Sequence, residues 1–373
     1  MRRPVLPSGL VGQVLVLVLV LVVVGCGAGE DPPDNGPRMA AWLEFVKTDE
    51  LAGRMAQAAE YELDVHTAVI RGEHDREFVR TACEQAQRHR LGHRLWPLLP
   101  EDEGYWPNQA NHATFRAWVD ELLGWAEADC PGLDGIMVDM EMPLDKARVL
   151  AAAAEGGGDD GAPPPDMGEL VAVFVDGVDE AVFAEGKDAY RDLCAAVKGQ
   201  GLTCNLTTLP VLVDDRADGD ETLALALWCP VEGIDWDELS FQVYRSLLQR
   251  FSFALPNADP QLTAGIVSSY AQDIVKYWPE RGAADLGTTS GGVFSAAGIS
   301  TAAELQADIA ATLAAGIPAD RINIYSLEGL DEHPDPADWV VVPAPVAASP
   351  GADDVSLREF LAGLDALVGD DDE

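Results

Sequence analysis

Short apolar runs and amphipathic stretches alternate along most of this chain. Between Trp42 and Leu330, apolar runs that end in polar residues are followed by segments in which apolar side chains recur every three or four positions. The first pattern is typical of buried strands and the second of surface helices. The predicted strands are Ala41–Val46, Leu63–Ile70, Arg94–Leu99, Gly135–Met140, Leu202–Leu206, Leu239–Tyr244, Leu262–Ser268 and Ile322–Ser326.

Strands that alternate with helices predict a parallel sheet. Eight of them over about 290 residues predict an α/β fold of the (β/α)8 TIM barrel type, built as a single domain. An open doubly wound sheet is the alternative, but no Gly-x-Gly-x-x-Gly follows the first strand and no phosphate-binding loop occurs. Helical patterns lie at Leu51–Tyr61, Asp75–Arg88, Thr114–Ala128 and Ala302–Ala315.

The first residues have the pattern of a targeting signal. Arg2 and Arg3 precede the apolar run Leu10–Val24, which is shorter than the about 20 residues of a membrane-spanning helix. The run closes on Val23-Val24-Gly25-Cys26, which resembles the lipobox of bacterial lipoproteins. The resemblance implies a signal peptide over residues 1–25, a lipidated (palmitate-bearing) Cys26, and a location in the cell envelope, anchored to a membrane. An ordinary signal peptide or N-terminal anchor with an incidental cysteine is the alternative.

The remaining boundaries follow from composition. Residues 26–38 are expected to form a tether and residues 39–334 the barrel. The low-complexity segment 151–166 is expected to be a flexible insertion after the fourth strand. Residues 335–373 are expected to form a Pro/Ala-rich, acidic C-terminal tail with one short helix near Val355–Leu367.

Charge and cysteine usage exclude several classes of function. The chain has 64 acidic and 24 basic residues and a net charge of −40, which excludes a nucleic-acid partner bound through phosphates. Six cysteines without a C-x-x-C motif and six scattered histidines indicate no metal site, and we expect no cofactor. The pattern does not indicate an oligomeric state.

Two acids at the end of the fourth strand are the main candidates for catalysis. Asp139 and Glu141 lie two positions apart, so they share one face of the strand. In a (β/α)8 barrel the catalytic groups come from these strand ends. Paired carboxyl groups raise each other's pKa, which suits a general acid that works near neutral pH.

The sequence DGIMVDME, residues 134–141, is similar to the DxxDxDxE motif of the family 18 chitinases and related glycosidases. The resemblance implies a (β/α)8 barrel that hydrolyses glycosidic bonds, with this motif on its fourth strand. By position, Glu141 matches the acid that protonates the glycosidic oxygen, and Asp139 matches the aspartate that orients the substrate's acetamido group. Asp134 matches the first motif position, whereas Met137 replaces the middle aspartate.

Two other strand ends resemble the same family. Phe241-Gln242-Val243-Tyr244-Arg245 resembles M-x-Y-D, with Tyr244 at the acetamido-binding tyrosine and Arg245 in place of the aspartate. On the eighth strand, Tyr325 stands where W-S-x-D has the tryptophan that forms the floor of the sugar subsite. The resemblance covers 8 + 5 + 5 = 18 residues on three strands. It implies that Gln242 and Tyr325 contact the sugar.

Aromatic residues near the third and seventh predicted strands are typical of a sugar site. Flat rings pack against the C–H face of a sugar, and neighbouring polar groups bond its hydroxyls. For each single aromatic residue, ordinary packing under a loop is the alternative. The candidates are Trp96, Tyr105 and Trp106 around the third strand, and Tyr277 and Trp278 after the predicted seventh strand.

A second carboxylate mechanism stays open. Glu141 is then the acid and Glu328, after the eighth strand, the nucleophile or base, with a surface position in the loop as the alternative for Glu328. Separations of about 5–5.5 Å or 6.5–9.5 Å would distinguish retention from inversion.

These observations predict a lipid-anchored glycoside hydrolase acting on a polysaccharide or oligosaccharide, with N-acetylated glycans as the candidate substrates. A non-catalytic glycan-binding lipoprotein on a retired barrel is the alternative. It is favoured by Met137 and Arg245, which replace acids of the family pattern.

Overall fold

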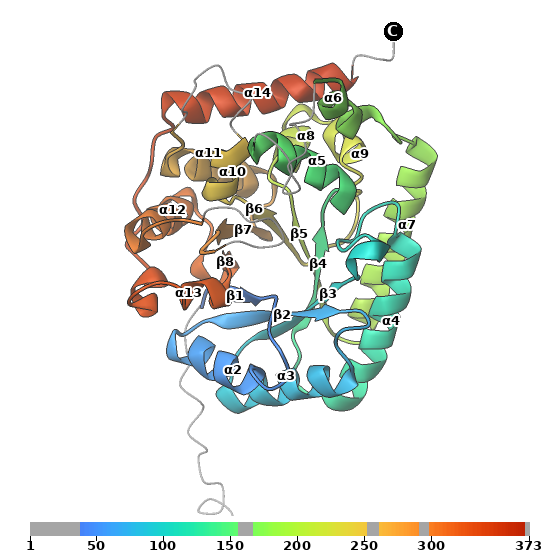
Figure 1. Ribbon diagram of the computed structural model, residues 1–373, viewed down its shortest axis with the longest axis vertical. Helices are drawn as coiled ribbons and strands as arrows, with labels where there is room; N and C mark the ends of the chain where they lie inside the picture. Colours follow the sequence, from blue (N-terminus) through green and yellow to red (C-terminus); the bar gives the residue numbers. More distant parts are fainter. Residues whose placement is uncertain (1–37, 156–166, 252–260, 291–297, 370–373) are drawn as a thin grey trace, which may run out of the picture. The chain divides into compact units, whose positions relative to one another are not determined.

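Eight parallel strands form a closed barrel in this computed structural model (Figure 1), which describes residues 38–155, 167–251, 261–290 and 298–369. Each strand pairs with its neighbour in chain order, and β1 closes the ring by pairing with β8. This confirms the predicted (β/α)8 fold. The strands are β1 (Ala40–Leu43), β2 (Asp64–Ile70), β3 (His93–Leu98), β4 (Gly135–Met140), β5 (Thr203–Thr208), β6 (Glu238–Gln242), β7 (Gly282–Gly287) and β8 (Ile322–Tyr325).

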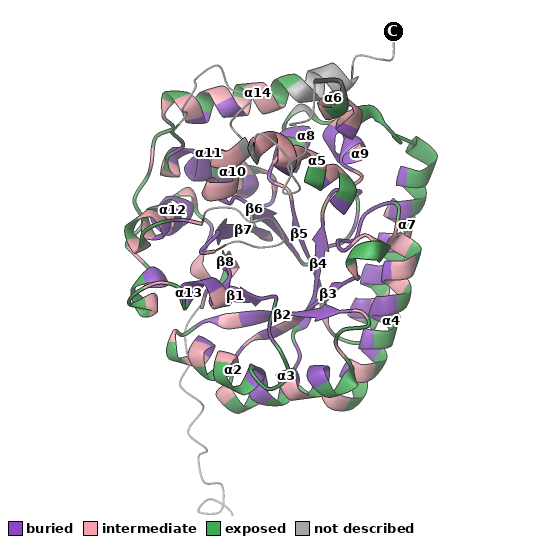
Figure 2. Cartoon of the chain, viewed as in Figure 1, coloured by how far each residue is buried: buried purple, intermediate pink, exposed green. Residues whose placement is uncertain are grey.

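Helices surround the barrel, with buried faces toward the strands and exposed faces outward (Figure 2). Two of the longer ones show clear sequence signals at their ends, because Asp75 caps α3 and Thr301 forms a capping box with Glu304 at α12. The helices are α2 (Leu51–Glu60), α3 (Arg76–His89), α4 (His112–Asp129), α5 (Leu144–Glu155), α6 (Met167–Val175), α7 (Glu180–Gly199), α8 (Leu212–Asp218), α9 (Thr222–Ala226), α10 (Arg245–Phe251), α11 (Ala264–Tyr277), α12 (Ala302–Ala315), α13 (Leu327–Leu330) and α14 (Ala352–Gly369).

The seventh strand is the one strand prediction that is wrong. Leu262–Ser268 is not a strand; most of it forms the first turns of α11, whose N-terminus is capped by the Thr263 side chain accepting a hydrogen bond from the backbone of Gly265 at 3.0 Å. The actual strand, Gly282–Gly287, is buried throughout but has only one large apolar residue, Leu286. Its small residues therefore gave no strand signal.

Side chains from strands that are not neighbours fill the lumen of the barrel and contact each other there. Arg94 on β3 reaches across to Glu238 on β6, with two N–H···O contacts of 2.7 and 3.0 Å. The ring of Trp42 on β1 packs against that of Trp96 on β3, with centroids 4.7 Å apart. Every second residue of these strands therefore faces the barrel axis, as the strand periodicity requires.

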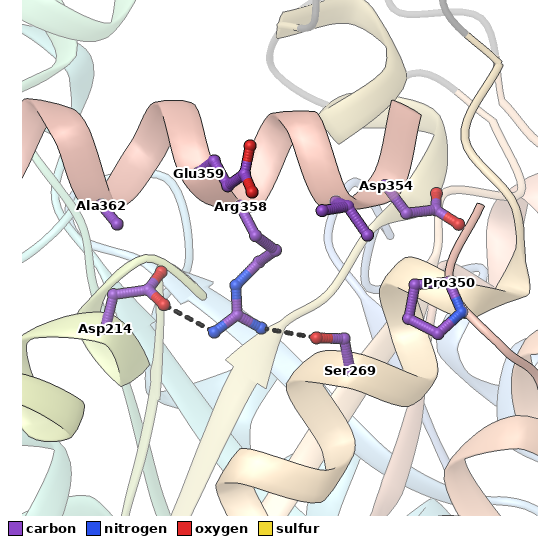
Figure 3. Close-up of a pocket in the computed structure, with 8 residues that line it drawn as sticks. Asp214, Ser269, Pro350, Asp354, Arg358, Glu359 and Ala362 are labelled. Atoms are coloured by element: carbon purple, nitrogen blue, oxygen red, sulfur yellow. Dashed lines mark hydrogen bonds and ion pairs between the residues drawn. The ribbon is translucent and has the colours of Figure 1, made fainter. Parts of the chain in front are cut away.

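The C-terminal helix α14 packs against α8, α9 and α11 (Figure 1). The predicted tail 335–373 is thus partly ordered on the barrel surface. Arg358 donates to Asp214 at 2.6 Å and to Ser269 at 3.1 Å (Figure 3), and its guanidinium lies over the ring of Tyr270. A pocket of about 370 Å³ lies between this helix and α8 and α11. Arg358 and Asp214, which line this pocket, are already paired with each other. The pocket is therefore part of the contact by which α14 packs on the barrel.

Four cysteines form two disulfides, Cys83–Cys130 and Cys194–Cys204. Cys229 is free and fully buried. Cys26 and the predicted signal peptide lie outside the described residues, as do residues 156–166 of the predicted insertion, whose first five residues end α5. Among the described helices, none is long and apolar enough to cross a membrane.

Candidate active site

The end of β4 places two carboxyl groups side by side at the mouth of the barrel. Asp139 is the fifth residue of β4, and Glu141 follows the strand directly. Gln242, the last residue of β6, donates its two amide N–H groups to them, at 2.9 Å to Asp139 Oδ1 and 2.8 Å to Glu141 Oε1. The two carboxyls also hydrogen-bond each other. One amide thus fixes both acids in a single geometry.

Burial gives both acids unusual proton affinities. Burial raises the pKa of Glu141 to about 7, although its bonds from Gln242 and Asp139 lower it. Burial and the neighbouring charges of Glu141, Glu44 and Asp285 raise the pKa of Asp139 well above its usual range. A carboxyl group with a pKa of about 7, as at Glu141, can both give and take a proton near neutral pH.

Glu44 is a third buried acid at this mouth, directly after β1. The Tyr105 hydroxyl donates to its Oε1 at 2.6 Å, and the Tyr325 hydroxyl donates to its Oε2. Burial raises the pKa of Glu44 to about 7, and the charges of Glu328 and Glu141 add to the rise. Two of the predicted sugar-binding residues, Tyr105 and Tyr325, therefore hold a carboxyl group in the structure.

Glu328 lies beside Glu44, in the short helix α13. Its Oε1 accepts hydrogen bonds from the backbone N–H of Glu44 at 2.7 Å and of Phe45 at 3.1 Å. Its Oε2 is shielded from solvent and accepts no hydrogen bond from another described residue. Its own backbone N–H also donates to this carboxyl group, and the residue thus links α13 to the end of β1. Its predicted part in catalysis stays a prediction.

Asp285 on β7 is a fourth buried acid in the lumen. It accepts hydrogen bonds from Thr207 at 2.5 Å and from Asn323 at 2.6 Å. Asn323 in turn accepts from His66 Nε2 at 3.0 Å, because its amide N–H already points to Asp285. Burial raises the pKa of Asp285 to about 6 and lowers that of His66 to about 3. One continuous hydrogen-bonded chain under the mouth thus runs from the neutral His66 through Asn323 and Asp285 to Thr207.

The other predicted sugar-binding aromatic residues are packed. Trp96 is 2% exposed inside the lumen, and Trp106 is 5% exposed beside Tyr105. Tyr277 and Trp278 do not follow the seventh strand as expected, because they end α11 and precede β7. They therefore lie toward the opposite end of the barrel from the four acids.

Tyr244 is buried, and its ring lies 5.7 Å from that of Tyr325. Burial raises the pKa of the Tyr244 hydroxyl well above its usual range, and the charges of Asp285, Asp139 and Glu141 raise it further. The hydroxyl therefore lies near these acids. Tyr244 thus lies with Asp139 and Glu141, as the sequence predicts. Whether the three act on a substrate stays a prediction.

The residues that depart from the family pattern do not fill the mouth with charge. Arg245 binds Asp308 on α12 with two contacts of 3.0 Å. Met137 is buried in β4, one inward position below Asp139. Asp134 lies at the start of the strands, where it accepts a hydrogen bond from His93 N at 2.7 Å.

The acids at the mouth have no basic partner among the described residues. In the described part of the chain, none of Glu44, Asp139, Glu141 and Asp285 forms an ion pair, and no three His, Cys, Asp or Glu side chains are grouped to bind a metal ion. The sequences of segments 156–166, 252–260 and 291–297, which lie outside the described residues, contain no Lys, Arg or His. No basic side chain from these segments can therefore neutralise the acids.

Glu44 and Asp285 are the site residues that the sequence analysis missed. Glu44 falls inside the predicted first strand, Ala41–Val46, which extends three residues beyond the observed end of β1 at Leu43. Asp285 lies on the strand that was assigned to the wrong segment. The signal for Glu44 was present, because an acid directly after a buried strand matches the pattern that identified Glu141.

The buried Glu44 should make stability depend on pH. Its pKa is about 7 in the folded chain against about 4.5 for a glutamate in water, so the stability that its protonated form contributes is lost as pH rises from about 4.5 to 7. We therefore compare the free energy of unfolding of Glu44→Gln with that of wild type. The difference, variant minus wild type, should be about 2–3 kcal/mol more positive at pH 8 than at pH 5. Urea unfolding at both pH values measures this.

The exposed Glu121→Gln is the matched control and should show no such gain. A Glu44→Gln variant whose difference from wild type stays constant between the two pH values would contradict the assignment.

No protein-family model matches the chain, and no curated protein does. Solved structures with a similar fold include D-psicose 3-epimerase from Clostridium cellulolyticum H10 (TM-score 0.41, 8% identity, 89% of this chain and 98% of that one). They also include a beta-mannanase from Thermomonospora fusca (0.39, 9%, 78% of each chain) and a glucosidase from Croceicoccus marinus (0.43, 10%, 88% and 68%). Structural similarities with such low TM-scores say nothing about activity. The fold assignment rests on the strand pairing of this chain.

Proposed function

We propose that this protein is a glycoside hydrolase that resembles the family 18 enzymes and uses Glu141 as its general acid and base. One observation carries the proposal: Glu141 lies at the mouth of the barrel with a pKa raised to about 7, hydrogen-bonded to Asp139 and Gln242. A carboxyl group with this proton affinity can protonate a leaving oxygen near neutral pH and take a proton back from water.

The neighbouring groups suit the remaining steps. In the proposed reaction Glu141 donates its proton to the glycosidic oxygen, and the bond to the sugar's anomeric carbon breaks. The substrate's own acetamido group attacks that carbon, with Asp139 and Tyr244 orienting it, as in the family. Water then completes hydrolysis, and Glu141 accepts its proton. In the second carboxylate mechanism, Glu328 replaces the acetamido group as the nucleophile or base. N-acetylated glycans are the proposed substrates of the first route.

A non-catalytic glycan-binding barrel is the second candidate function. It is favoured by Met137, which puts an apolar, fully buried side chain where the family has its middle aspartate. Arg245 does not favour it further, because its guanidinium binds Asp308 instead of filling the mouth. Detectable glycan binding without any hydrolysis would support this candidate.

We also propose that Cys26 is lipidated and holds the barrel at the cell envelope. Support comes from the lipobox-like segment that ends at Cys26 and the polar stretch after it. Cys26→Ser should move the protein from the membrane fraction to the soluble fraction and remove the mass of the acyl chains from its N-terminal peptide. An unchanged distribution, with no acyl mass on wild type, would rule lipidation out.

Glu141→Gln should abolish hydrolysis while leaving the fold intact. The amide keeps the size of the side chain but carries no transferable proton, and loss of a general acid costs about 10²–10⁴-fold in rate. Product release from fluorogenic glycosides and chito-oligosaccharides measures the effect, with Glu121→Gln as the control that should keep full activity. If Glu141→Gln cleaves as fast as wild type, the assignment of Glu141 fails.

The pH profile of the reaction should depend on Gln242. A general acid must be protonated, so kcat/KM should fall as pH rises through about 7, the pKa of Glu141. Gln242→Met removes an N–H donor that lowers this pKa, and the midpoint of the fall should move up by about 1 pH unit. An unmoved midpoint would show that another group sets the profile.

A further inference from the structure

We infer that Asp285 on β7 is a positioning residue of this site: its carboxylate, held in the lumen by three neutral donors, is the fixed negative charge that keeps a proton on Glu141. The inference rests on the proposed function, because it names the residue that sets the pH range in which the proposed acid works. Asp285 acts through its charge and transfers no proton itself, so it is not a catalytic residue.

Three neutral donors from three strands surround the Asp285 carboxyl group. Thr207 on β5 donates its hydroxyl to Oδ2 at 2.5 Å, Asn323 on β8 donates its amide to Oδ1 at 2.6 Å, and Ser240 on β6 bonds the same carboxyl group. The side chain is fully buried, and both of its oxygens are occupied. Because a carboxyl group that accepts several hydrogen bonds is stabilised in its ionised form, the lumen holds Asp285 as a fixed anion.

The strand register places this carboxylate close to the two acids of the mouth. Thr207, which donates to Asp285, is the register partner of Asp139 on β4. Gln242, which donates to both Asp139 and Glu141, is the register partner of Asp285 on β7. Two polar side chains thus connect Asp285 with the pair of acids, and its charge raises the pKa of both.

The charge of Asp285 is not offset by a base in the described part of the chain. Arg94, which reaches across the lumen, binds Glu238 with both contacts, and the charge of Glu238 raises the pKa of Asp285 further. His66 is joined to Asp285 through Asn323, but burial lowers its pKa to about 3 and keeps the imidazole neutral. The field of Asp285 therefore acts on the pair without a neighbouring cation to cancel it.

The other titratable groups that face the pair are neutral near pH 7, with one exception. Burial raises the pKa of the Tyr105 and Tyr244 hydroxyls and of the Cys229 thiol, so none of the three carries a charge there. The exception is Glu44, whose pKa of about 7 lies in the same range and whose charge raises the pKa of Asp139. Every variant in the test therefore keeps Glu44 unchanged.

The test measures how far Asp285→Asn moves the titration of Glu141. Carbon-13 NMR of the full chain, labelled at the glutamate carboxyl carbons, follows Glu141 directly, since its resonance is the one absent from Glu141→Gln. Asp285→Asn keeps the size of the side chain and removes its charge, so the midpoint should fall by about 1 pH unit. The loss of kcat/KM with rising pH should move down equally, which is opposite to the shift expected for Gln242→Met. A merely structural disturbance would lower kcat without moving either midpoint.

Thr207→Val is a second variant, which leaves Asp285 in place. It removes a donor that lowers the pKa of Asp285, so fewer molecules carry the charge and the Glu141 midpoint should also fall. Thr207→Ser keeps the hydroxyl and should keep the wild-type midpoint. Asp192→Asn, on the exposed face of α7, removes the same charge elsewhere and should also leave the midpoint unchanged.

A Glu141 midpoint that stays in place or rises in Asp285→Asn would overturn the inference. A midpoint that Thr207→Val leaves unmoved, or that Thr207→Ser moves as far as Thr207→Val does, would overturn it too. If Asp285→Asn does not fold, the two Thr207 variants decide the question.

Cleavage by wild type separates this inference from the proposed function. If wild type cleaves a glycoside but the Glu141 midpoint does not fall in the variants, the role of Asp285 fails and the hydrolase stands. If the NMR midpoint falls as expected but wild type cleaves no glycoside, the role of Asp285 as the charge that acts on Glu141 stands and the hydrolase fails.

Discussion

The constraint on which the site depends is the burial of several carboxyl groups in one barrel lumen without a basic partner among the described residues. Asp139, Glu141, Glu44 and Asp285 must each remain neutral or receive hydrogen bonds from uncharged donors, because isolated buried charges are costly. The chain meets this need with tyrosine and threonine hydroxyls and with side-chain amides. The neutral donors keep the acids in place without forming the ion pairs that would lower their pKa values.

The lumen therefore has two electrostatic layers. At the start of the strands, Arg94 and Glu238 neutralise each other in a paired layer. Toward the mouth lie the acids, of which Asp285 is linked through Asn323 to His66, whose imidazole stays neutral because burial lowers its pKa to about 3. This arrangement leaves the net negative charge of the interior at the end where the loops follow the strands, the end at which barrel enzymes bind their substrates.

The sequence was sufficient for the barrel and for part of the site. The fourth strand was predicted at its observed bounds, because its apolar run is long and ends in acids at known spacing. The prediction of the seventh strand is wrong, because the actual strand Gly282–Gly287 is buried although most of its side chains are small. Hydrogen bonds such as those of Gln242 join residues about a hundred positions apart, and no local pattern contains that information.

Cys229, the free thiol within the described residues, has a consequence for the covalent stability of the fold. Cys229 is fully buried, and burial raises the pKa of its thiol well above the usual range. Exchange of disulfides needs an accessible thiolate, so Cys229 cannot attack Cys83–Cys130 or Cys194–Cys204 in the native state. Scrambling of the bridges by Cys229 should therefore begin from molecules that have already unfolded around this residue.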